Sequence, residues 1–292
     1  MSINHDNKIF DLDPPAKKCF VSFLDLMGLN NLIETLGTAE AASKVAQFVF
    51  HTLLRLETSS DLKFCEELSV SIKHPEAILY KRKPNYILLS DSLILYSQND
   101  DILDFLSLVY ITRQALIVMF SSDMLIRGSI AYGDLCVQDD FNFIVGDALI
   151  KAYRLERIQN WFGVVIHKSC LERFGAENED TFCVKILNAI DSKKNPLLVY
   201  FLKRYLPCWI TKWDIPYKKE FSKGTKLAIN WPSSLGIKPR CYYNCASHYV
   251  YPTENAKRNK KMLEDVEEKL ENTKAFIRDN FNFCYEYNPR DL

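Results

Sequence analysis

The sequence predicts an α+β fold built on a sheet rich in antiparallel strand pairs, and three observations lead to this prediction. Short apolar runs of strand length alternate with segments of helical spacing. Two of the runs, within residues 86–97, flank a two-residue Ser-Asp turn in the pattern of a β-hairpin. The first six elements then follow the order β, α, β, β, α, β, which is that of the ferredoxin-like unit.

The first elements of the chain are a polar leader, a strand and an interrupted helix. Residues 1–16 are polar and end close to two prolines, so we expect a mobile leader there. Residues 19–26 form a short apolar run that predicts a strand. Residues 30–57 predict a helix with a break near Gly37, where Thr38 could cap a second segment.

The elements after this helix are less uniform in pattern. Residues 63–80 alternate only in part and could form a strand, and residues 81–85 form a turn. After the hairpin, the sequence predicts a helix over 100–120, strands over 125–137 and 141–145, a helix over 146–160 and a strand over 162–170. Residues 259–276 carry mixed charges at helical spacing, which predicts a solvated helix packed on one face that could also serve in a dimer.

Charge and apolar content argue against several classes of protein. Lys and Arg together number 37, as do Asp and Glu, so no basic surface favours a nucleic-acid partner. The N-terminal segment lacks the apolar core of a signal peptide. The most apolar stretch is interrupted by Asp104 and Arg113, so we expect a buried helix there and no membrane span. The nine cysteines lack regular spacing, which favours reduced thiols in a cytoplasmic protein.

Two aspartates stand at strand ends that the predicted topology brings together. In a ferredoxin-like sheet the first and third strands are antiparallel neighbours, so Asp25 and Asp91 are expected at one sheet edge. Close carboxylates repel each other unless a cation lies between them. Mg²⁺ or Mn²⁺ takes oxygen ligands and commonly arrives with substrate phosphates. The pair therefore predicts a divalent-metal site, although each aspartate alone could be a strand-end cap or a turn residue.

Four motifs, in order, resemble those of class III nucleotide cyclases. FLDLMG at 23–28 is similar to the family's first metal-binding motif, and LSDSLILYS at 89–97 to its second. IRGSIAYGDL at 126–135 resembles the next strand of the family, and GDALIKAYRLE at 146–156 resembles the following helix. The last two motifs look most like the bacterial Pycsar cyclases, class III relatives that make cyclic CMP or cyclic UMP in anti-phage defence.

The resemblance implies a reaction, a metal set and a domain layout. Residues 17–170 would form the cyclase palm, and residues 171–292 an extension packed on it. The enzyme would join the ribose 3′-oxygen of a nucleoside triphosphate to its α-phosphate and release pyrophosphate. Two Mn²⁺ or Mg²⁺ ions per site would be held by Asp25, Asp91 and the backbone of Leu26.

The resemblance also assigns residues to the phosphates. Arg154 would stabilise the charge that develops on the α-phosphate, although it could instead be a surface arginine paired with Glu156 or Asp147. Free amides around Gly28 and Leu29, near a helix N-terminus, could hold the β- and γ-phosphates. Phe23, in the same motif, belongs to the expected substrate site.

The base pocket departs from the purine cyclases of the family. Their two purine-reading positions correspond to Ile87 and Phe143, and both are apolar here, which favours UTP or CTP as the substrate. Arg127 could read a pyrimidine carbonyl or bind phosphate, or form a structural ion pair. Tyr80 and Tyr86 flank the hairpin and could stack on a base, or could belong to the core.

The same resemblance implies a homodimer, because class III cyclases take the metal aspartates and the transition-state arginine from different subunits. The cyclic nucleotide product would act on a separate effector protein. Two other functions remain open: a purine cyclase with an unusual pocket, and a catalytically silent module that senses nucleotide. Cys241, Cys245 and His248 lack a fourth ligand and the usual zinc-site spacing, so packing or chance is favoured over a metal there.

Overall fold

The fold is described from a computed structural model, in which the described residues are 15–49, 79, 81–121, 124–138, 143–190, 196–218, 224–231 and 260–281. The leader up to residue 14 lies outside these ranges. So do nearly all of the predicted 63–80 segment and the cysteine–histidine cluster at 241–248.

The secondary structure follows the predicted order closely. The strands are β1 Lys17–Met27, β2 Asn85–Leu89, β3 Ser92–Tyr96, β4 Leu125–Gln138, β5 Phe143–Val145, β6 Val164–Ile166, β7 Ile210–Ile215 and β8 Gly224–Ile229. The helices are α1 Leu29–Leu36, α2 Thr38–Val49, α6 Ile102–Ser121, α7 Asp147–Ile158, α8 Lys168–Arg173, α9 Glu179–Ala189, α10 Pro196–Trp209 and α13 Lys260–Phe281.

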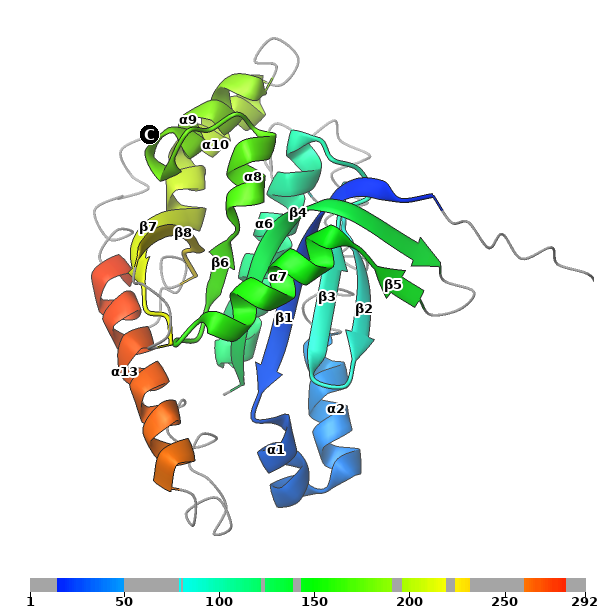
Figure 1. The fold of residues 1–292 in the computed structure, drawn as a ribbon, viewed down its shortest axis with the longest axis vertical. Coiled ribbons are helices and arrows are strands. Elements are labelled where there is room, and N and C mark those ends of the chain that lie inside the picture. Colours follow the sequence, from blue (N-terminus) through cyan, green and yellow to red (C-terminus); the bar gives the residue numbers. More distant parts are fainter. Residues whose placement is uncertain are drawn as a thin grey trace, which may run out of the picture.

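One mixed sheet organises the chain (Figure 1). Its strand order is β2-β3-β1-β4-β6-β8-β7, and β5 pairs with β4 off this path. Among the described strands, β4 and β6 are parallel neighbours and the other pairs are antiparallel. The predicted α+β class and the adjacency of the first and third strands are therefore confirmed. The strands β8 and β7 extend the same sheet beyond β6, which the sequence did not predict.

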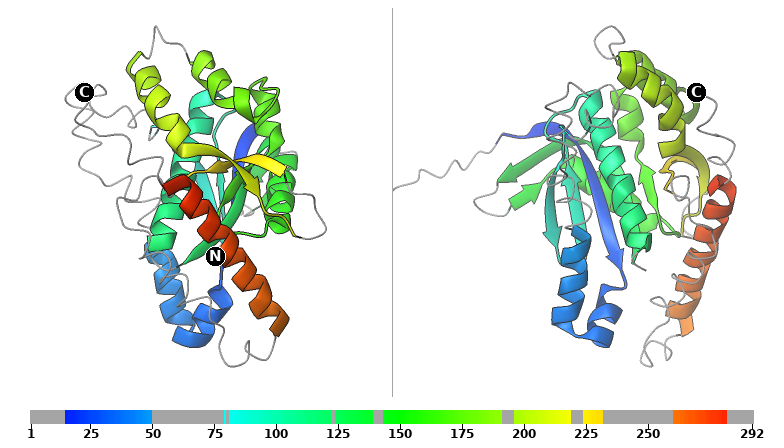
Figure 2. Two further views of the ribbon diagram at one scale, coloured as in Figure 1. Left: turned by 90° about the vertical axis from the view of Figure 1, so that its left-hand side faces the viewer. Right: turned by 180° about the vertical axis from the view of Figure 1, so that it is seen from behind.

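The central strand β1 is buried on both faces, which explains its nearly continuous apolar run. Phe20 and Leu24 pack with α6 on one face of the sheet. Val21 and Phe23 pack with α7 on the other face. The two helices lie on opposite sides of the sheet in Figures 1 and 2. Because side chains alternate along a strand, Asp25 belongs to the face covered by α7.

Two boundaries show how local chemistry ends an element. The helix predicted over 30–57 breaks at Gly37, which has a φ of 81°, and α2 begins at Thr38. The strand predicted over 162–170 is too long, because β6 ends at Ile166 and α8 follows. The ring of His167 accepts a hydrogen bond from the N–H of Ser169 at 3.1 Å and so caps this helix.

The helix α6 is long and apolar enough to cross a membrane by length and composition, and it is the one such helix in the described ranges. In the fold, 67% of its apolar window is buried. Asp104, near its start, pairs with Arg82, and the Nε of Arg113 donates to the carbonyl of Asn230 at 2.8 Å. These contacts place α6 in the core, as the sequence predicts.

Candidate active site

Asp25 and Asp91 meet at the sheet edge where β1 ends. Asp25 stands in register with Arg127 of β4 and with the first residue of β3. The turn between β2 and β3 contains Ser90, with a left-handed φ of 56°, and Asp91. The carbonyl of Asp91 accepts a hydrogen bond of 2.6 Å from the N–H of Leu26. The structure thus brings the two aspartates together, while their role as metal ligands stays a prediction.

The surroundings of Asp25 suit a cation. Its side chain is 22% exposed. Burial raises the pKa of Asp25, Arg127 lowers it, the carboxylate of Asp91 raises it again, and Lys269 lowers it. The pKa remains raised, which means that the anionic form of Asp25 is undercompensated. A cation shared by the two carboxylates would supply the missing compensation.

The donor set fits Mg²⁺ or Mn²⁺. Carboxylate oxygens are the hard ligands that these ions prefer, and Mg²⁺ commonly binds through one or two carboxylates together with water and substrate phosphates. Within the described ranges no group of three or more metal-ligating side chains occurs. The other ligand positions would therefore fall to water, to phosphate oxygens and to the predicted backbone carbonyl of Leu26.

The turn after β1 is suited to bind anions. Gly28 has a φ of 85°, a conformation that glycine adopts without strain. α1 begins at the next residue, Leu29, and has neither a side-chain cap nor an acidic residue in its first turn. Its first N–H groups are therefore available at the positive end of the helix dipole. Gly28 and Leu29 follow Asp25 within four residues, and their role in phosphate binding stays a prediction.

Arg127 has the structural ion pair that was one of its three predicted roles. It is 7% exposed, and its Nε and Nη2 both contact Oε1 of Glu156. The same Nη2 lies 3.6 Å from Oδ2 of Asp25, and Nη1 donates to the carbonyl of Gln159 at 3.4 Å. The guanidinium therefore bridges two carboxylates and also contacts one backbone carbonyl.

The sequence did not predict Glu156 as part of the site, and indicated it only as a possible partner of Arg154. Glu156 is 2% exposed, and it shares the buried face of α7 with Ala148 and Ala152. The four-residue spacing of these three positions is a signal that could have identified a buried carboxylate on this helix. A buried carboxylate requires a partner, and Arg127 supplies it.

Arg154 lies on the exposed side of α7. In the part of the chain that the structure describes, it forms no ion pair with Asp25 or Asp91. Its predicted alternative partners are engaged elsewhere, since Glu156 pairs with Arg127, and Asp147 pairs with a lysine one turn along α7. One copy of the chain therefore does not place Arg154 at the aspartates.

The predicted base-contacting residues are spread over two elements. Tyr86, 37% exposed, and the half-buried Ile87 lie on β2. Phe143 is 45% exposed on β5 and pairs with Gln138, which is 138 − 127 = 11 residues beyond Arg127 along β4. That separation is on the order of 35 Å along an extended strand. Phe143 and Asp25 are therefore at opposite ends of the sheet within one copy.

Two other predicted residues complete the set. Phe23 is buried, and its ring packs edge-on against Tyr153 of α7 with the ring centroids 5.5 Å apart. It belongs to the buried cluster between the sheet and α7, two residues before Asp25. Tyr80 lies outside the described residues.

The C-terminal helix α13 adds a cation that the sequence analysis did not associate with the site. Lys269 of this helix is close enough to Asp25 to lower its pKa. α13 is fixed beside the sheet (Figure 2): Oγ1 of Thr273 accepts from the N–H of Phe162 at 2.8 Å, and Nδ2 of Asn272 donates to the carbonyl of Asn160 at 2.7 Å. The predicted one-sided packing of this helix is thereby confirmed.

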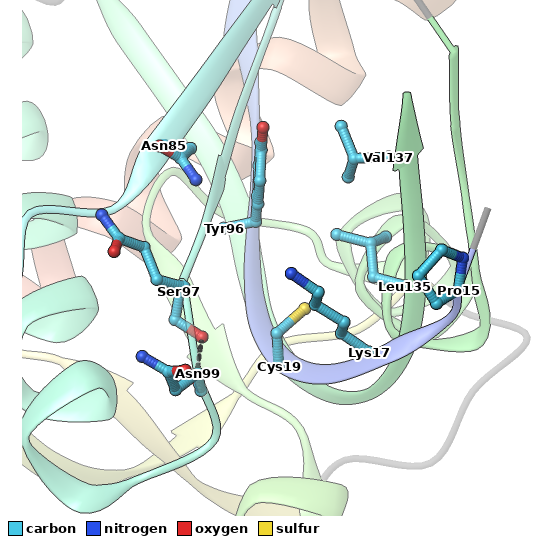
Figure 3. A pocket seen from close by; sticks show the side chains of 10 residues that line it. Pro15, Lys17, Cys19, Asn85, Tyr96, Ser97, Asn99, Leu135 and Val137 are labelled. Atoms are coloured by element: carbon cyan, nitrogen blue, oxygen red, sulfur yellow. Dashed lines mark hydrogen bonds between the residues drawn. The ribbon is translucent and has the colours of Figure 1, made fainter. Parts of the chain in front are cut away.

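A pocket of about 540 Å³ lies at the opposite end of β1 (Figure 3). Its lining includes Cys19, which precedes Asp25 by six residues, on the order of 20 Å along the strand. No carboxylate lines it, and amide and hydroxyl side chains supply most of its polar groups. The hydroxyl of Ser97 donates to the carbonyl of Asn99 at 2.6 Å. This pocket is separate from the aspartate site.

No protein-family model and no curated protein matches the sequence. Among solved structures, the chain is similar to the adenylyl cyclase CyaB from P. aeruginosa, at a TM-score of 0.38 and 13% identity, over 75% of this chain and 95% of that one. It is also similar to the guanylyl cyclase Cya2, at a TM-score of 0.36 and 11% identity, over 74% and 92% of the two chains.

A third similar structure is a class III adenylyl cyclase-like ATP-binding protein from Pseudomonas aeruginosa. Its TM-score is 0.35 at 10% identity, over 66% of this chain and 45% of that one. At these values the fold assignment rests on the sheet order and strand register given above.

Proposed function

We propose that the protein is a nucleotide cyclase that converts UTP or CTP into the 3′,5′-cyclic nucleotide and pyrophosphate. The observation that carries the proposal is the meeting of Asp25 and Asp91 beside the uncapped N-terminus of α1. Carboxylates for divalent cations and free amides for phosphates are thereby combined at one edge of the sheet. That combination is what a nucleoside triphosphate with its metal ions requires.

The reaction needs a positioned triphosphate and an activated 3′-hydroxyl. The ribose 3′-oxygen forms a bond to the α-phosphorus while the bond from that phosphorus to the bridging oxygen of pyrophosphate breaks, and the hydroxyl proton passes to solvent. Bound Mg²⁺ or Mn²⁺ would neutralise the phosphates and lower the pKa of the hydroxyl. Asp25 and Asp91 would hold the ions, the amides of Gly28 and Leu29 would orient the phosphates, and Arg154 would face the α-phosphate.

The proposed active unit is a homodimer with two composite sites. Among the described residues of one copy, Arg154 makes no ion pair with the aspartates, and Phe143 lies at the far end of β4. A twofold arrangement can bring both to the Asp25 of the second copy. Exposed apolar side chains on β2, β5 and α7 support such a contact surface: Leu88, Leu89, Phe143, Val145, Ile150 and Tyr153.

The proposed base preference follows from the same surface. Ile87 and Phe143 offer apolar contacts where purine cyclases have polar purine readers, so neither can donate or accept a hydrogen bond to a purine edge. UTP or CTP is therefore the proposed substrate. By the sequence resemblance, the product would be a messenger in anti-phage defence that acts in the cytoplasm on a separate effector protein.

The experiment that tests the function is an incubation of the purified protein with each of the four ribonucleoside triphosphates and Mn²⁺. Cyclic UMP or cyclic CMP formed well above cyclic AMP and cyclic GMP supports the proposal. Comparable turnover of ATP would indicate a purine cyclase. Binding of nucleotide without any cyclic product, measured with the same preparation, would indicate a silent nucleotide sensor.

A further inference from the structure

Two carboxylates compete for one buried guanidinium at the end of β1. Arg127 contacts Oε1 of Glu156 through both Nε and Nη2, but it approaches Asp25 only to 3.6 Å through Nη2. The guanidinium is therefore aligned on Glu156, and Asp25 receives the weaker share of its charge. Arg127 and Asp25 are cross-strand partners in register, so a direct and closer pair between them is within reach.

The position of Glu156 is fixed independently of Asp25. It lies on the face of α7 that packs on the sheet, two turns after Ala148 and one turn after Ala152, both fully buried. The hydroxyl of Ser129 donates to the carbonyl of Ala152 at 2.5 Å, which joins this turn of the helix to β4. Gln159 holds the other side of the guanidinium through its carbonyl, and its own side chain donates to the carbonyl of Gly128 at 2.9 Å.

We infer that Glu156 is a positioning residue that holds Arg127 away from Asp25 and so keeps the Asp25–Asp91 pair open to a divalent cation. This inference rests on the proposed function, because it assumes that the two aspartates bind the metal. Glu156 binds the guanidinium of Arg127, and Asp25 therefore retains an anionic oxygen that can bind the ion.

The charges give the expected order of cation affinity. Lys269 is unchanged in all variants and is left out of the sum. In the wild type, the formal charges of four side chains add to −1 − 1 − 1 + 1 = −2: Asp25, Asp91, Glu156 and Arg127. Glu156→Gln leaves −1 and frees Arg127 to close on Asp25. The double variant Arg127→Met with Glu156→Gln restores −2 with no guanidinium to compete. Replacing a buried ion pair by neutral groups of similar volume is commonly tolerated by the fold.

The test is the dissociation constant of Mn²⁺, measured by titration calorimetry on the full-length chain without nucleotide. Glu156→Gln should weaken Mn²⁺ binding by about tenfold or more, the usual scale for residues that orient metal ligands. The double variant should bind Mn²⁺ at least as tightly as the wild type. Asp147→Asn is the matched control, because it removes a negative charge from the same helix at an exposed position and should leave the affinity unchanged.

The outcomes separate this inference from the proposed metal site. If Asp25→Ala binds Mn²⁺ as well as the wild type, the metal site itself is wrong. If Asp25→Ala loses binding but Glu156→Gln does not, only the role of Glu156 is wrong. Equal weakening in Glu156→Gln and in the double variant would show a merely structural effect and overturn the inference. If Glu156→Gln does not fold, the double variant still tests the inference. Mn²⁺ binding to the double variant that is tenfold weaker than to the wild type would contradict the charge argument.

Discussion

The two ends of the β1–β4 pair differ in chemistry although both belong to one continuous piece of sheet. At one end, the ionisable side chains of Asp25, Arg127 and Glu156 form a network at or below the surface. At the other end, the ion pair of Lys18 and Asp134 lies at the surface, the pocket beside Cys19 has no carboxylate in its lining, and β5 carries the exposed ring of Phe143. The charged end is suited to phosphates and metal ions, and the far end to contacts with an uncharged base or a second chain.

In the proposed homodimer, each copy supplies only part of a nucleotide site. A nucleoside triphosphate is far shorter than the separation between Asp25 and Phe143, on the order of 35 Å along β4. The charged end of one copy must therefore be completed by the far end and by α7 of another copy, if these elements contribute to one site.

The largest effect is expected at the charged end. Asp25→Ala or Asp91→Ala should lower the rate of cyclic nucleotide formation by about 100-fold or more, because loss of a direct metal ligand exceeds the usual loss from an outer partner. The fold should survive, since removing one of two close carboxylates relieves repulsion. Activity assays paired with thermal unfolding check this. Wild-type turnover by either folded variant contradicts the metal assignment.

Mixing variants tests whether the two copies complete each other. Asp91→Ala and Arg154→Ala should each be inactive, but their mixture should recover roughly a quarter of wild-type activity by symmetry. Random exchange makes about half of the dimers heterodimeric, and each heterodimer has one intact site of two. Subunit exchange is verified with two affinity tags. Exchange without recovery would mean that both residues serve one chain's site, or that Arg154 is not catalytic.

A smaller effect is expected from the C-terminal helix. Lys269→Ala should raise the KM for the nucleoside triphosphate by about fivefold, the equivalent of roughly 1 kcal/mol for a partly screened charge near the phosphates. Lys274→Ala is the matched control on the same helix, where the lysine pairs with Glu271. Steady-state kinetics of both variants decide the point. An equal effect of the two substitutions would remove Lys269 from the site.

The smallest effect is expected at the far end of β1. Cys19→Ala removes a buried thiol whose pKa is raised by burial to about 12, so the group is neutral and takes no part in the proposed chemistry. The free energy of unfolding should fall by about 1 kcal/mol, as for other small core truncations. Denaturant unfolding measures this loss. The kcat should stay unchanged, and a fall in kcat would show that this end of the sheet affects the reaction.

The part of the site that the sequence predicted depends on strand order. Asp25 and Asp91 are 66 positions apart, yet the predicted order of the elements and the hairpin whose turn contains Asp91 were enough to place both at one edge. The positions of Gly28 and of the start of α1 beside Asp25 were predicted because these residues come directly after Asp25 in the sequence. Such features are local or are fixed by the pairing of neighbouring elements, and pattern analysis captures both.

The parts that the sequence did not predict depend on distant packing. Lys269 comes to Asp25 from 269 − 25 = 244 positions away, through hydrogen bonds of α13 that no pattern within the helix specifies. The pairing of Glu156 with Arg127 required knowing which face of α7 meets β4. The early end of β6 depended on the side-chain cap of His167, which pattern rules treat as one more residue of a strand.

The pairing of β8 with β6 has a consequence for any shortened form of the protein. β6 is three residues long and wholly apolar, and its outer side is covered by β8, with Val165 opposite Ala228. A fragment ending at residue 170 would leave that side as an open edge of unpaired N–H and C=O groups flanked by valine and isoleucine. Such an edge recruits strands from other molecules. The C-terminal strands thus cover this edge and prevent it from pairing with strands of other molecules. A fragment cut before them would form aggregates instead of a minimal folded domain.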